Sequence, residues 1–307
     1  MKNLKEFVES NPDLVSRKES KTYPGLFVLK YTKKVFFDAL WEKSELLKYC
    51  RGLVVDADYN VVVRGFNKIF NYKENNAGSN WSDSDMVFVT KKINGFCAFL
   101  TNVNDKLIIS TTGSLDSDFI GYARDYLKDI TPDMCEKEIT YLFEICHPAD
   151  PHIIPEPAGA HFLGAVCHDD GTEYYKFDTG STLINQAIDN FTPLGIHTVE
   201  ESQVMWLFGQ LKKHIKNVKH EGYVIINSND VSKAALKIKS PYYLFNKFLA
   251  RIGTNRLISG INSGSIFQTI DEEYYSLVHK IKSSGVENFA ALDEQARLQY
   301  LRNWSET

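Results

Sequence analysis

Short runs of β-branched and aromatic residues, separated by turn residues, fill the first part of the chain and predict β-hairpins. The strands expected from these runs lie at 26–31, 53–56, 61–64, 95–100, 107–110, 162–166 and 173–175. Gly171, in the turn of the last hairpin, can adopt the positive φ that a tight turn needs. The pattern therefore favours antiparallel strands joined by short turns.

Helices are predicted near 115–129, 181–191 and 200–214. Because hairpins are interleaved with helices without a regular strand-helix alternation, the pattern indicates an α+β fold with largely antiparallel sheets. After Tyr243 the strand signals end, and apolar residues recur at helical spacing up to a break at Gly285. We therefore predict a large domain over residues 1–245 and a small all-helical C-terminal domain over residues 246–307.

Composition narrows the class of protein. The 307 residues are 43% hydrophobic and 24% charged, which is ordinary for a folded domain. No stretch approaches the ~20 apolar residues of a membrane helix, and the first residues lack the apolar run of a signal peptide, so we expect a cytoplasmic protein with no membrane partner. Five scattered cysteines fit reduced thiols better than a disulfide framework. The net charge of -4 does not decide whether the chain binds nucleic acid, because phosphate contacts depend on local basic clusters.

A candidate nucleophile, Lys92, follows the apolar run 86–90 and precedes Gly95. It is expected at a strand end where a ligand can approach closely. An amine attacks phosphorus only when unprotonated, and neighbouring cations lower its pKa. Lys237 and Lys239 alternate on one expected strand and so share a face, from which they would lower the pKa of Lys92 and stabilise charge on an α-phosphate. The alternative interpretation is that these are exposed strand lysines.

Two glutamates complete the set. Glu144 is expected at the end of one strand, and Glu221 opens another. A carboxylate in such a place can accept hydrogen bonds from ribose hydroxyls or bind Mg²⁺, or it can be a solvated strand terminus or an ion-pair partner. Together, the lysine nucleophile, the two carboxylates and the phosphate-binding lysines are the parts needed for covalent nucleotidyl transfer.

A second pattern lies upstream of the lysine. The chain has an arginine-glycine strand over 50–56, followed by the pattern K-x-F-N in residues 64–71. With the four segments above, it resembles the ATP-dependent RNA ligases of the bacteriophage RNA ligase 1 type, from about residue 20 to residue 245. These belong to the covalent nucleotidyltransferases, as do DNA ligases and capping enzymes, which lack this arrangement before the nucleophile. The resemblance implies the nucleotidyltransferase fold, with the helical C-terminal domain added.

The resemblance also implies roles for single residues. It makes Lys92 the carrier of the adenylate, Glu221 the metal ligand and a catalytic residue, and Lys237 and Lys239 the catalytic contacts to the α-phosphate. The residues that it assigns to ATP are Arg51, Lys68, Phe70, Lys91, Gly95, Glu144 and Tyr243; for Phe70, core packing is the alternative. The chain departs from the family pattern at Thr112, where a lysine is expected before a Gly-Ser pair, and at His152, where an arginine is expected.

The implied reaction joins RNA ends in three steps. Lys92 takes AMP from ATP, AMP moves to an RNA 5′-phosphate, and an RNA 3′-hydroxyl displaces it, with Mg²⁺ or Mn²⁺ offsetting the charge that develops. RNA repair, including sealing of a nicked tRNA, is the expected context. The basic stretch 211–219 is either an RNA contact or a solvated helix face. Another polynucleotide ligase, a capping guanylyltransferase and a non-catalytic RNA- or nucleotide-binding protein are the alternatives.

Overall fold

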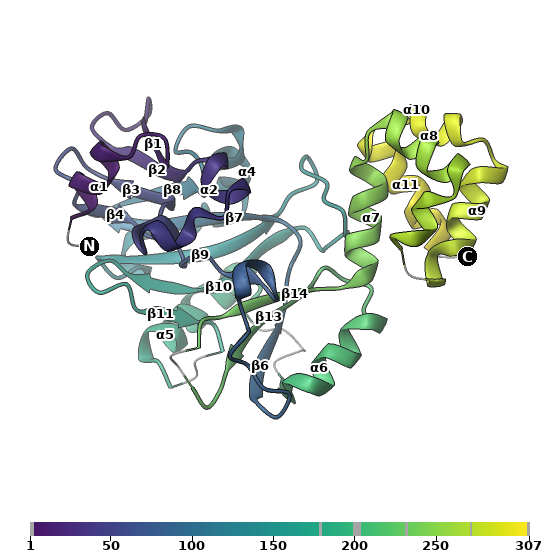
Figure 1. Cartoon of the computed structure of the whole chain (residues 1–307). Helices are drawn as coiled ribbons and strands as arrows, with labels where there is room; N and C mark the ends of the chain where they lie inside the picture. Colours follow the sequence, from purple (N-terminus) through teal and green to yellow (C-terminus); the bar gives the residue numbers. More distant parts are fainter. Residues whose placement is uncertain (1–2, 178–179, 199–203, 231–232, 271, 306–307) are drawn as a thin grey trace. The chain divides into compact units, whose positions relative to one another are not determined.

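A computed structural model describes residues 3–177, 180–198, 204–230, 233–270 and 272–305 of the chain (Figure 1). The chain forms two compact units. Unit 1 contains Met1–Ser79, Gly95–Asp150 and Glu156–Gln203, and unit 2 contains Asn80–Asn94, Pro151–Pro155 and Val204–Thr307. Both units are therefore built from segments that lie far apart in the sequence.

Unit 1 contains two antiparallel sheets. The N-terminal sheet has the order β1-β2-β3-β4, and the central sheet has the order β11-β10-β9-β7-β8. The strands of these two sheets are β1 Val15–Glu19, β2 Phe27–Tyr31, β3 Arg51–Val55, β4 Val61–Val63, β7 Phe96–Val103, β8 Lys106–Thr111, β9 Ile139–Cys146, β10 Gly159–Cys167 and β11 Glu173–Tyr175. The short strand β5 Phe70–Asn71 follows β4 in the chain and is not part of either sheet. All three hairpins expected from the hydrophobic pattern are present.

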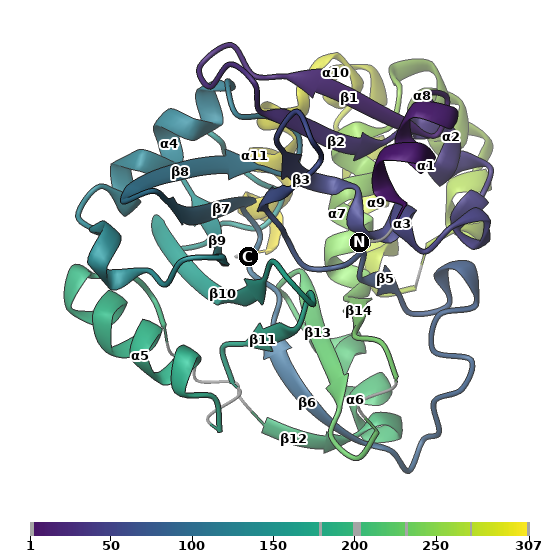
Figure 2. The same ribbon diagram turned by 90° about the vertical axis from the view of Figure 1, so that its left-hand side faces the viewer.

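The central sheet buries both of its faces. Phe99 and Leu142 share a hydrophobic core with Val54 of the N-terminal sheet, whereas their sequence neighbours face α4 (Asp118–Leu127) and α5 (Thr182–Phe191). Figure 2 shows these two helices beside the central sheet. Alternate side chains of a strand point to opposite faces, so one strand can serve two cores. The consequence is that β7 and β9 are mostly apolar and do not alternate regularly between apolar and polar residues.

Helices also cover the outer face of the N-terminal sheet. The helices α1 (Leu4–Ser10), α2 (Lys33–Phe37) and α3 (Leu46–Tyr49) contribute buried residues to one core with β2 and β3, and Trp41 is at its centre with 1% of its surface exposed. The short 3₁₀ helices of unit 1 are η1 Leu40–Lys43, η2 Glu74–Asn76, η3 Pro132–Met134 and η4 Thr192–Leu194. Unit 1 thus stacks helices, two sheets and helices.

Unit 2 is built around an antiparallel sheet in which β12, β6, β13 and β14 are neighbours in this order. The strands are β12 Val204–Leu207, β6 Met86–Lys91, β13 Gly222–Asn227 and β14 Leu236–Lys239, and α6 Phe208–His214 with η5 Ile215–Asn217 follows β12. The helix expected over 200–214 is therefore wrong over 204–207, because this segment pairs with β6 and tertiary pairing overrides a weak local preference. Residues 200–203 lie outside the described residues.

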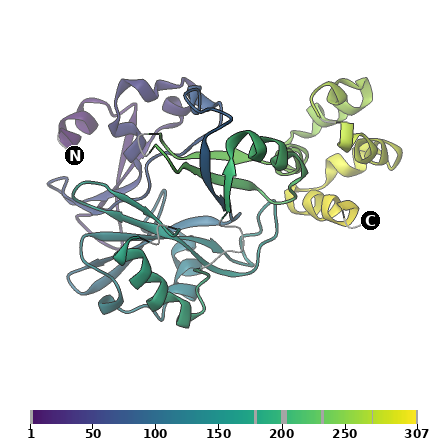
Figure 3. The same ribbon diagram turned by 90° about the horizontal axis from the view of Figure 1, so that it is seen from below.

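The rest of unit 2 is helical. Its helices are α7 Pro241–Arg251, α8 Thr254–Ser263, α9 Tyr275–Ser283, α10 Val286–Ala291 and α11 Glu294–Ser305, with η6 Ser265–Gln268 and η7 Glu272–Tyr274 between them (Figure 3). They share one hydrophobic core, to which Ile153 and Ile154 also contribute. The expected domain boundary between residues 245 and 246 falls inside α7, and the two-domain division stays a prediction.

The predicted fold class is confirmed: hairpins and helices alternate irregularly, the sheets are antiparallel, and the C-terminal segment is helical. Within the described residues, no helix combines the length and the apolar character needed to cross a membrane.

Candidate active site

The candidate nucleophile, Lys92, directly follows β6, as the sequence predicted. Its backbone N–H donates to the carbonyl oxygen of Gly222 at 2.8 Å, so the pairing of β6 with β13 extends to this residue. Its Nζ lies 2.9 Å from Oε2 of Glu221, and 21% of the side chain is exposed. The sheet thus fixes the backbone of Lys92 and leaves its side chain partly open to solvent.

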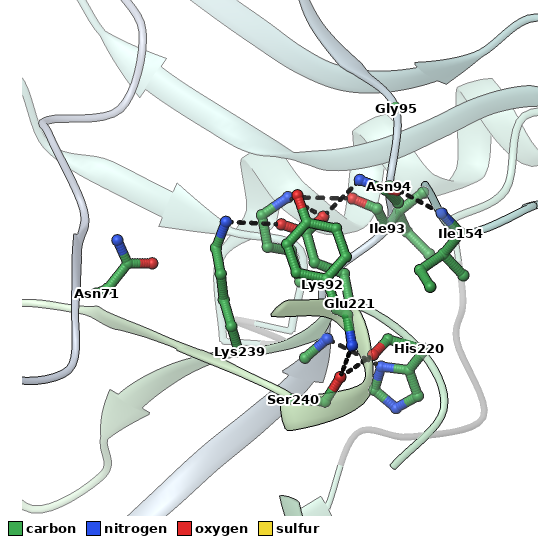
Figure 4. Close-up of polar contacts among 12 residues, drawn as sticks. Asn71, Lys92, Ile93, Asn94, Gly95, Ile154, His220, Glu221, Lys239 and Ser240 are labelled. Atoms are coloured by element: carbon green, nitrogen blue, oxygen red, sulfur yellow. Dashed lines mark hydrogen bonds and ion pairs between the residues drawn. The ribbon is translucent and has the colours of Figure 1, made fainter. Parts of the chain in front are cut away.

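Glu221 is the centre of a charged cluster in unit 2 (Figure 4). Only 2% of its side chain is exposed, and its two oxygens contact Nζ of Lys92 at 2.9 Å and Nζ of Lys239 at 3.3 Å. Burial raises the pKa of Glu221, but the two lysines outweigh burial, so its pKa lies below the ordinary value of 4.5. The carboxylate therefore stays ionised and holds both lysines in place.

Asn94 fixes the orientation of this carboxylate, although it was not among the site residues predicted from the sequence. Its Nδ2 donates to Oε2 of Glu221 at 2.8 Å, and its Oδ1 accepts the backbone N–H of Ile154 at 2.9 Å. Only 6% of Asn94 is exposed. Since the amide uses both ends, Asn94 is a positioning residue. Its place inside the Lys92-to-Gly95 motif is the signal that identifies it.

Two small residues bring Lys239 close to Glu221. Gly222 has φ +142°, and a Cβ on it would lie 2.1 Å from the carbonyl oxygen of Ile238 on the neighbouring strand. At the end of β14, the hydroxyl of Ser240 donates to the carbonyl oxygen of His220 at 2.5 Å and accepts the N–H of Tyr243 at 3.1 Å. The side chain of Ser240 thus caps α7 and links its start to the segment that contains Glu221, directly before β13.

The other predicted residues of unit 2 lie on the same elements. Lys237 and Lys239 occupy alternate positions of β14, with the buried Ile238 between them, so they share a face. The ring of Tyr243 lies 4.8 Å from Nζ of Lys239, and burial raises the pKa of its hydroxyl to about 12. Lys91 is the last residue of β6. The fold therefore places the predicted unit 2 residues on β6, β13, β14 and the start of α7.

In unit 1, Glu144 accepts a hydrogen bond from the backbone N–H of Gly95 at 3.1 Å. The expectation that Glu144 ends its strand is wrong, because β9 continues to Cys146 and pairs with β7 and β10 on both sides. A Cβ on residue 95 would lie 2.3 Å from the carbonyl oxygen of Ile145. Glycine at 95 is thus required by close packing on β9, in addition to any ligand.

Lys68 and Phe70 lie together elsewhere in unit 1. Nζ of Lys68 is 3.1 Å from Oε1 of Glu74 and 4.6 Å from the ring centre of Phe70, and 7% of the Lys68 side chain is exposed. Phe70 also meets Trp41 edge to face, with ring centres 5.2 Å apart. The packing alternative for Phe70 therefore holds, without excluding contact with a ligand. Glu74, the ion-pair partner of Lys68, lies in none of the sequence motifs and so was not predicted as a site residue.

Arg51 begins β3, and the strand register places it opposite Lys30 of β2. Nζ of Lys30 lies beside Gly113, the residue after Thr112, because a Cβ on that glycine would be 3.4 Å from it. Lys30 therefore places a cation beside the position where the family pattern has its lysine.

Comparison with known proteins decides the family. A model of a family described as RNA ligase matches residues 49–243, which is more than half of the chain. The chain belongs to the RNA ligase family. The predicted family and class of enzyme are confirmed. No curated protein sequence matches this RNA ligase significantly.

Solved structures agree with the fold. Two archaeal ATP-dependent RNA ligase structures, form 1 and form 2, are each 15% identical to this RNA ligase, with TM-scores of 0.57 and 0.55. The matches cover 96% and 97% of this chain and 77% and 74% of theirs. A putative ATP-dependent DNA ligase from Aquifex aeolicus is 14% identical, with a TM-score of 0.52 and coverage of 92% and 73%. These likenesses show that the RNA ligase has the fold of these ligases.

Proposed function

We propose that this RNA ligase is ATP-dependent and begins its reaction at Lys92. In the first step, Nζ of Lys92 forms a bond to the α-phosphorus of ATP while the α–β anhydride bond breaks. Pyrophosphate leaves, and the amine loses its proton. The observation that carries this proposal is the cluster in which buried Glu221 holds Nζ of Lys92 at 2.9 Å and Nζ of Lys239 at 3.3 Å.

The later steps conserve the energy of that bond. An oxygen of an RNA 5′-phosphate attacks the AMP phosphorus, the P–N bond breaks, and Lys92 regains a proton. The 3′-hydroxyl of a second RNA end then attacks the 5′-phosphate, and AMP leaves as the phosphodiester forms. Lys237 and Lys239 stabilise the charge on the AMP phosphate in each transfer, since both extend from one face of β14.

Mg²⁺ or Mn²⁺ is the proposed divalent cation, and the carboxylate of Glu221 is the kind of oxygen ligand that these ions prefer. The described residues contain no group of three or more His, Cys, Asp or Glu side chains placed to bind a metal. Mg²⁺ commonly binds through one or two carboxylates together with substrate phosphates and water, so a single glutamate suffices. When bound, the cation offsets the charge on pyrophosphate and AMP as they leave. Glu221 is the residue that would hold it.

The unit 1 residues are proposed to bind the nucleotide. Glu144 accepts hydrogen bonds from the ribose hydroxyls. Gly95 has no side chain, so the ligand can approach the backbone closely there. Lys68 and Phe70, together with Arg51 at the start of β3, contact the phosphates and the base. In unit 2, Lys91 and Tyr243 complete the proposed set. What supports these roles is the family membership together with the burial of Glu144, which is 9% exposed.

The test is incubation of the protein with ATP or GTP labelled at the α-phosphate, with Mg²⁺ present. We expect a covalent AMP adduct that acid hydrolyses and base leaves intact, as is typical of a phosphoramide bond. Adduct from GTP in preference to ATP would instead indicate a capping enzyme. Sealing of nicked DNA in preference to RNA with 5′-phosphate and 3′-hydroxyl ends would indicate a DNA ligase.

The proposed substrate is a broken RNA with these two kinds of end, and RNA repair, including sealing of a nicked tRNA, is the proposed context. A cytoplasmic location stays a prediction. Lys212 in the basic stretch 211–219 pairs with Asp83, which supports the helix-face interpretation for that residue.

A further inference from the structure

Helix α7 carries a further cation beside the proposed site. Lys247 follows Tyr243 by four residues and precedes Arg251 by four, so these three side chains lie on one face of the helix at one-turn intervals. Nζ of Lys247 lies 5.7 Å from the ring centre of Tyr243, and Nζ of Lys239 lies 4.8 Å from the same centre. The ring is thus shared by a lysine of β14 and a lysine of α7.

Lys247 differs from the next cation on this face. Arg251 is paired with Glu294, with Nε and Oε1 2.8 Å apart. Among the residues that the structure describes, Lys247 forms no ion pair and is half-buried. Burial lowers the pKa of Lys247, and the charges of Lys239 and Arg251 lower it further, more than Glu221 raises it.

The cluster therefore carries more positive than negative charge. Glu221 offsets part of the charge of Lys92 and Lys239, and Lys247 adds a third lysine without adding a carboxylate. Holding several cations together in a partly buried place is unfavourable unless an anion joins them. A phosphate group, which offers several charged oxygens to lysine donors, is the anion that an RNA ligase handles.

We propose that Lys247 is a phosphate-binding residue of this enzyme, acting on a phosphate other than the one held by Lys237 and Lys239. The inference rests on the proposed function, because it assigns a further substrate contact to the same site. Two phosphates have this chemistry: the β,γ-phosphates of ATP, which leave as pyrophosphate, and the 5′-phosphate of the RNA end. The first is present while AMP is transferred to Lys92, and the second while AMP is transferred from Lys92 to the RNA.

Direct binding measurements separate the two sources. Wild type and Lys247→Met would be titrated in a calorimeter with inorganic pyrophosphate, and with one RNA oligonucleotide bearing either a 5′-phosphate or a 5′-hydroxyl. Methionine keeps the apolar stem over Tyr243 and removes only the charge. Loss of one charged hydrogen bond should lower the affinity for one of the two phosphate probes about tenfold. Weaker pyrophosphate binding assigns Lys247 to ATP, and weaker binding of the 5′-phosphorylated RNA alone assigns it to the RNA end.

Matched variants keep the test decisive. Lys247→Arg keeps the charge and should retain binding, and Lys282→Met, at an exposed position of α9, should leave every probe unchanged. Unchanged affinity of Lys247→Met for both phosphate probes overturns the inference. The inference is also overturned if Lys247→Met loses as much affinity for the 5′-hydroxyl RNA as for the 5′-phosphorylated RNA. It is overturned as well if Lys247→Met and Lys247→Arg lower the melting temperature equally, because the residue would then be structural. None of these titrations needs the lysyl-adenylate, so failure of the proposed function is seen separately, as a wild-type protein that forms no adduct.

Discussion

The two buried glutamates of the candidate site show how differently the two units use the same side chain. In unit 2, Glu221 contacts two lysines and an asparagine, and these contacts keep its pKa below the ordinary value despite burial. In unit 1, Glu144 lies within β9 and accepts the backbone N–H of Gly95. One carboxylate pairs with the charged ends of lysine side chains, and the other accepts a hydrogen bond from the backbone.

This difference in surroundings indicates that the two carboxylates have different roles in the reaction. A carboxylate that holds lysines controls where their charges lie, so its loss should affect a transition state in which charge develops. A carboxylate fixed by a backbone N–H offers its remaining lone pairs to a ligand in one orientation, which suits recognition of hydroxyl groups. The comparison therefore predicts a loss of rate at Glu221 and a loss of affinity and selectivity at Glu144.

The largest effect is expected at the nucleophile. Lys92→Ala should form no adduct from α-labelled ATP, yet should still seal RNA that is already adenylylated, because that substrate bypasses the first step. Gel analysis of label transfer and of sealing on one preparation checks both parts. Label on Lys91, or undiminished label in the variant, would show that the nucleophile is another residue.

Glu221→Ala and Lys239→Ala should each slow adduct formation by about 10²- to 10³-fold, the usual cost of removing one group that stabilises a transition state. Single-turnover rates at saturating ATP measure the effect. Circular dichroism provides the control for folding, because removing one partner of a buried ion pair can cost about 3–5 kcal/mol. Near-normal rates in a folded variant would make the residue structural.

Glu144→Gln should act mainly on nucleotide affinity. The amide retains one acceptor but loses the charge, so the apparent KM for ATP should rise about tenfold, with a smaller change in the maximal rate. Comparison of ATP with 2′-deoxy and 3′-deoxy ATP sharpens the test, since the variant should discriminate less between them than wild type does. Unchanged discrimination would remove Glu144 from ribose recognition and end the contrast with Glu221.

The smallest effect concerns pH and compares one histidine from each unit. Burial lowers the pKa of His220 in unit 2 and of His168 in unit 1 to about 4. Because the unfolded chain takes up a proton near the ordinary value of 6.5, each group costs no stability above that pH and makes the fold less stable as pH falls from 6.5 towards about 4.

His220→Gln and His168→Gln should therefore each flatten the fall of the melting temperature over this pH range, by about 3 °C at its acidic end. Thermal melts at intervals between pH 7.5 and pH 4.5 measure the slope. A slope equal to that of wild type in either variant would mean that this histidine does not stay neutral in the fold.

Much of the fold follows from local pattern. Short runs of β-branched and aromatic residues predict the hairpins of unit 1, because such side chains suit strands with buried faces. Lys237 and Lys239 share a face because alternate side chains of a strand point to the same side. The segment 204–207 could not be predicted as a strand, because it pairs with β6, which lies more than a hundred residues earlier in the chain. The end of β9 was misplaced likewise, since two neighbouring strands extend it past Glu144.

By itself, the sequence determined the residue types that nucleotidyl transfer needs, the α+β class and the family, because side-chain chemistry and strand periodicity are local properties. Only the tertiary structure decided which groups meet. It joined Glu221 to Lys92 and Asn94, which lie 129 and 127 positions away, and brought Lys239 of β14 to the same Tyr243 ring that Lys247 contacts within α7. The physical reason is that the charge and hydrogen bonding of a buried group depend on neighbours within a few ångströms, and sheet pairing brings those neighbours from distant parts of the chain.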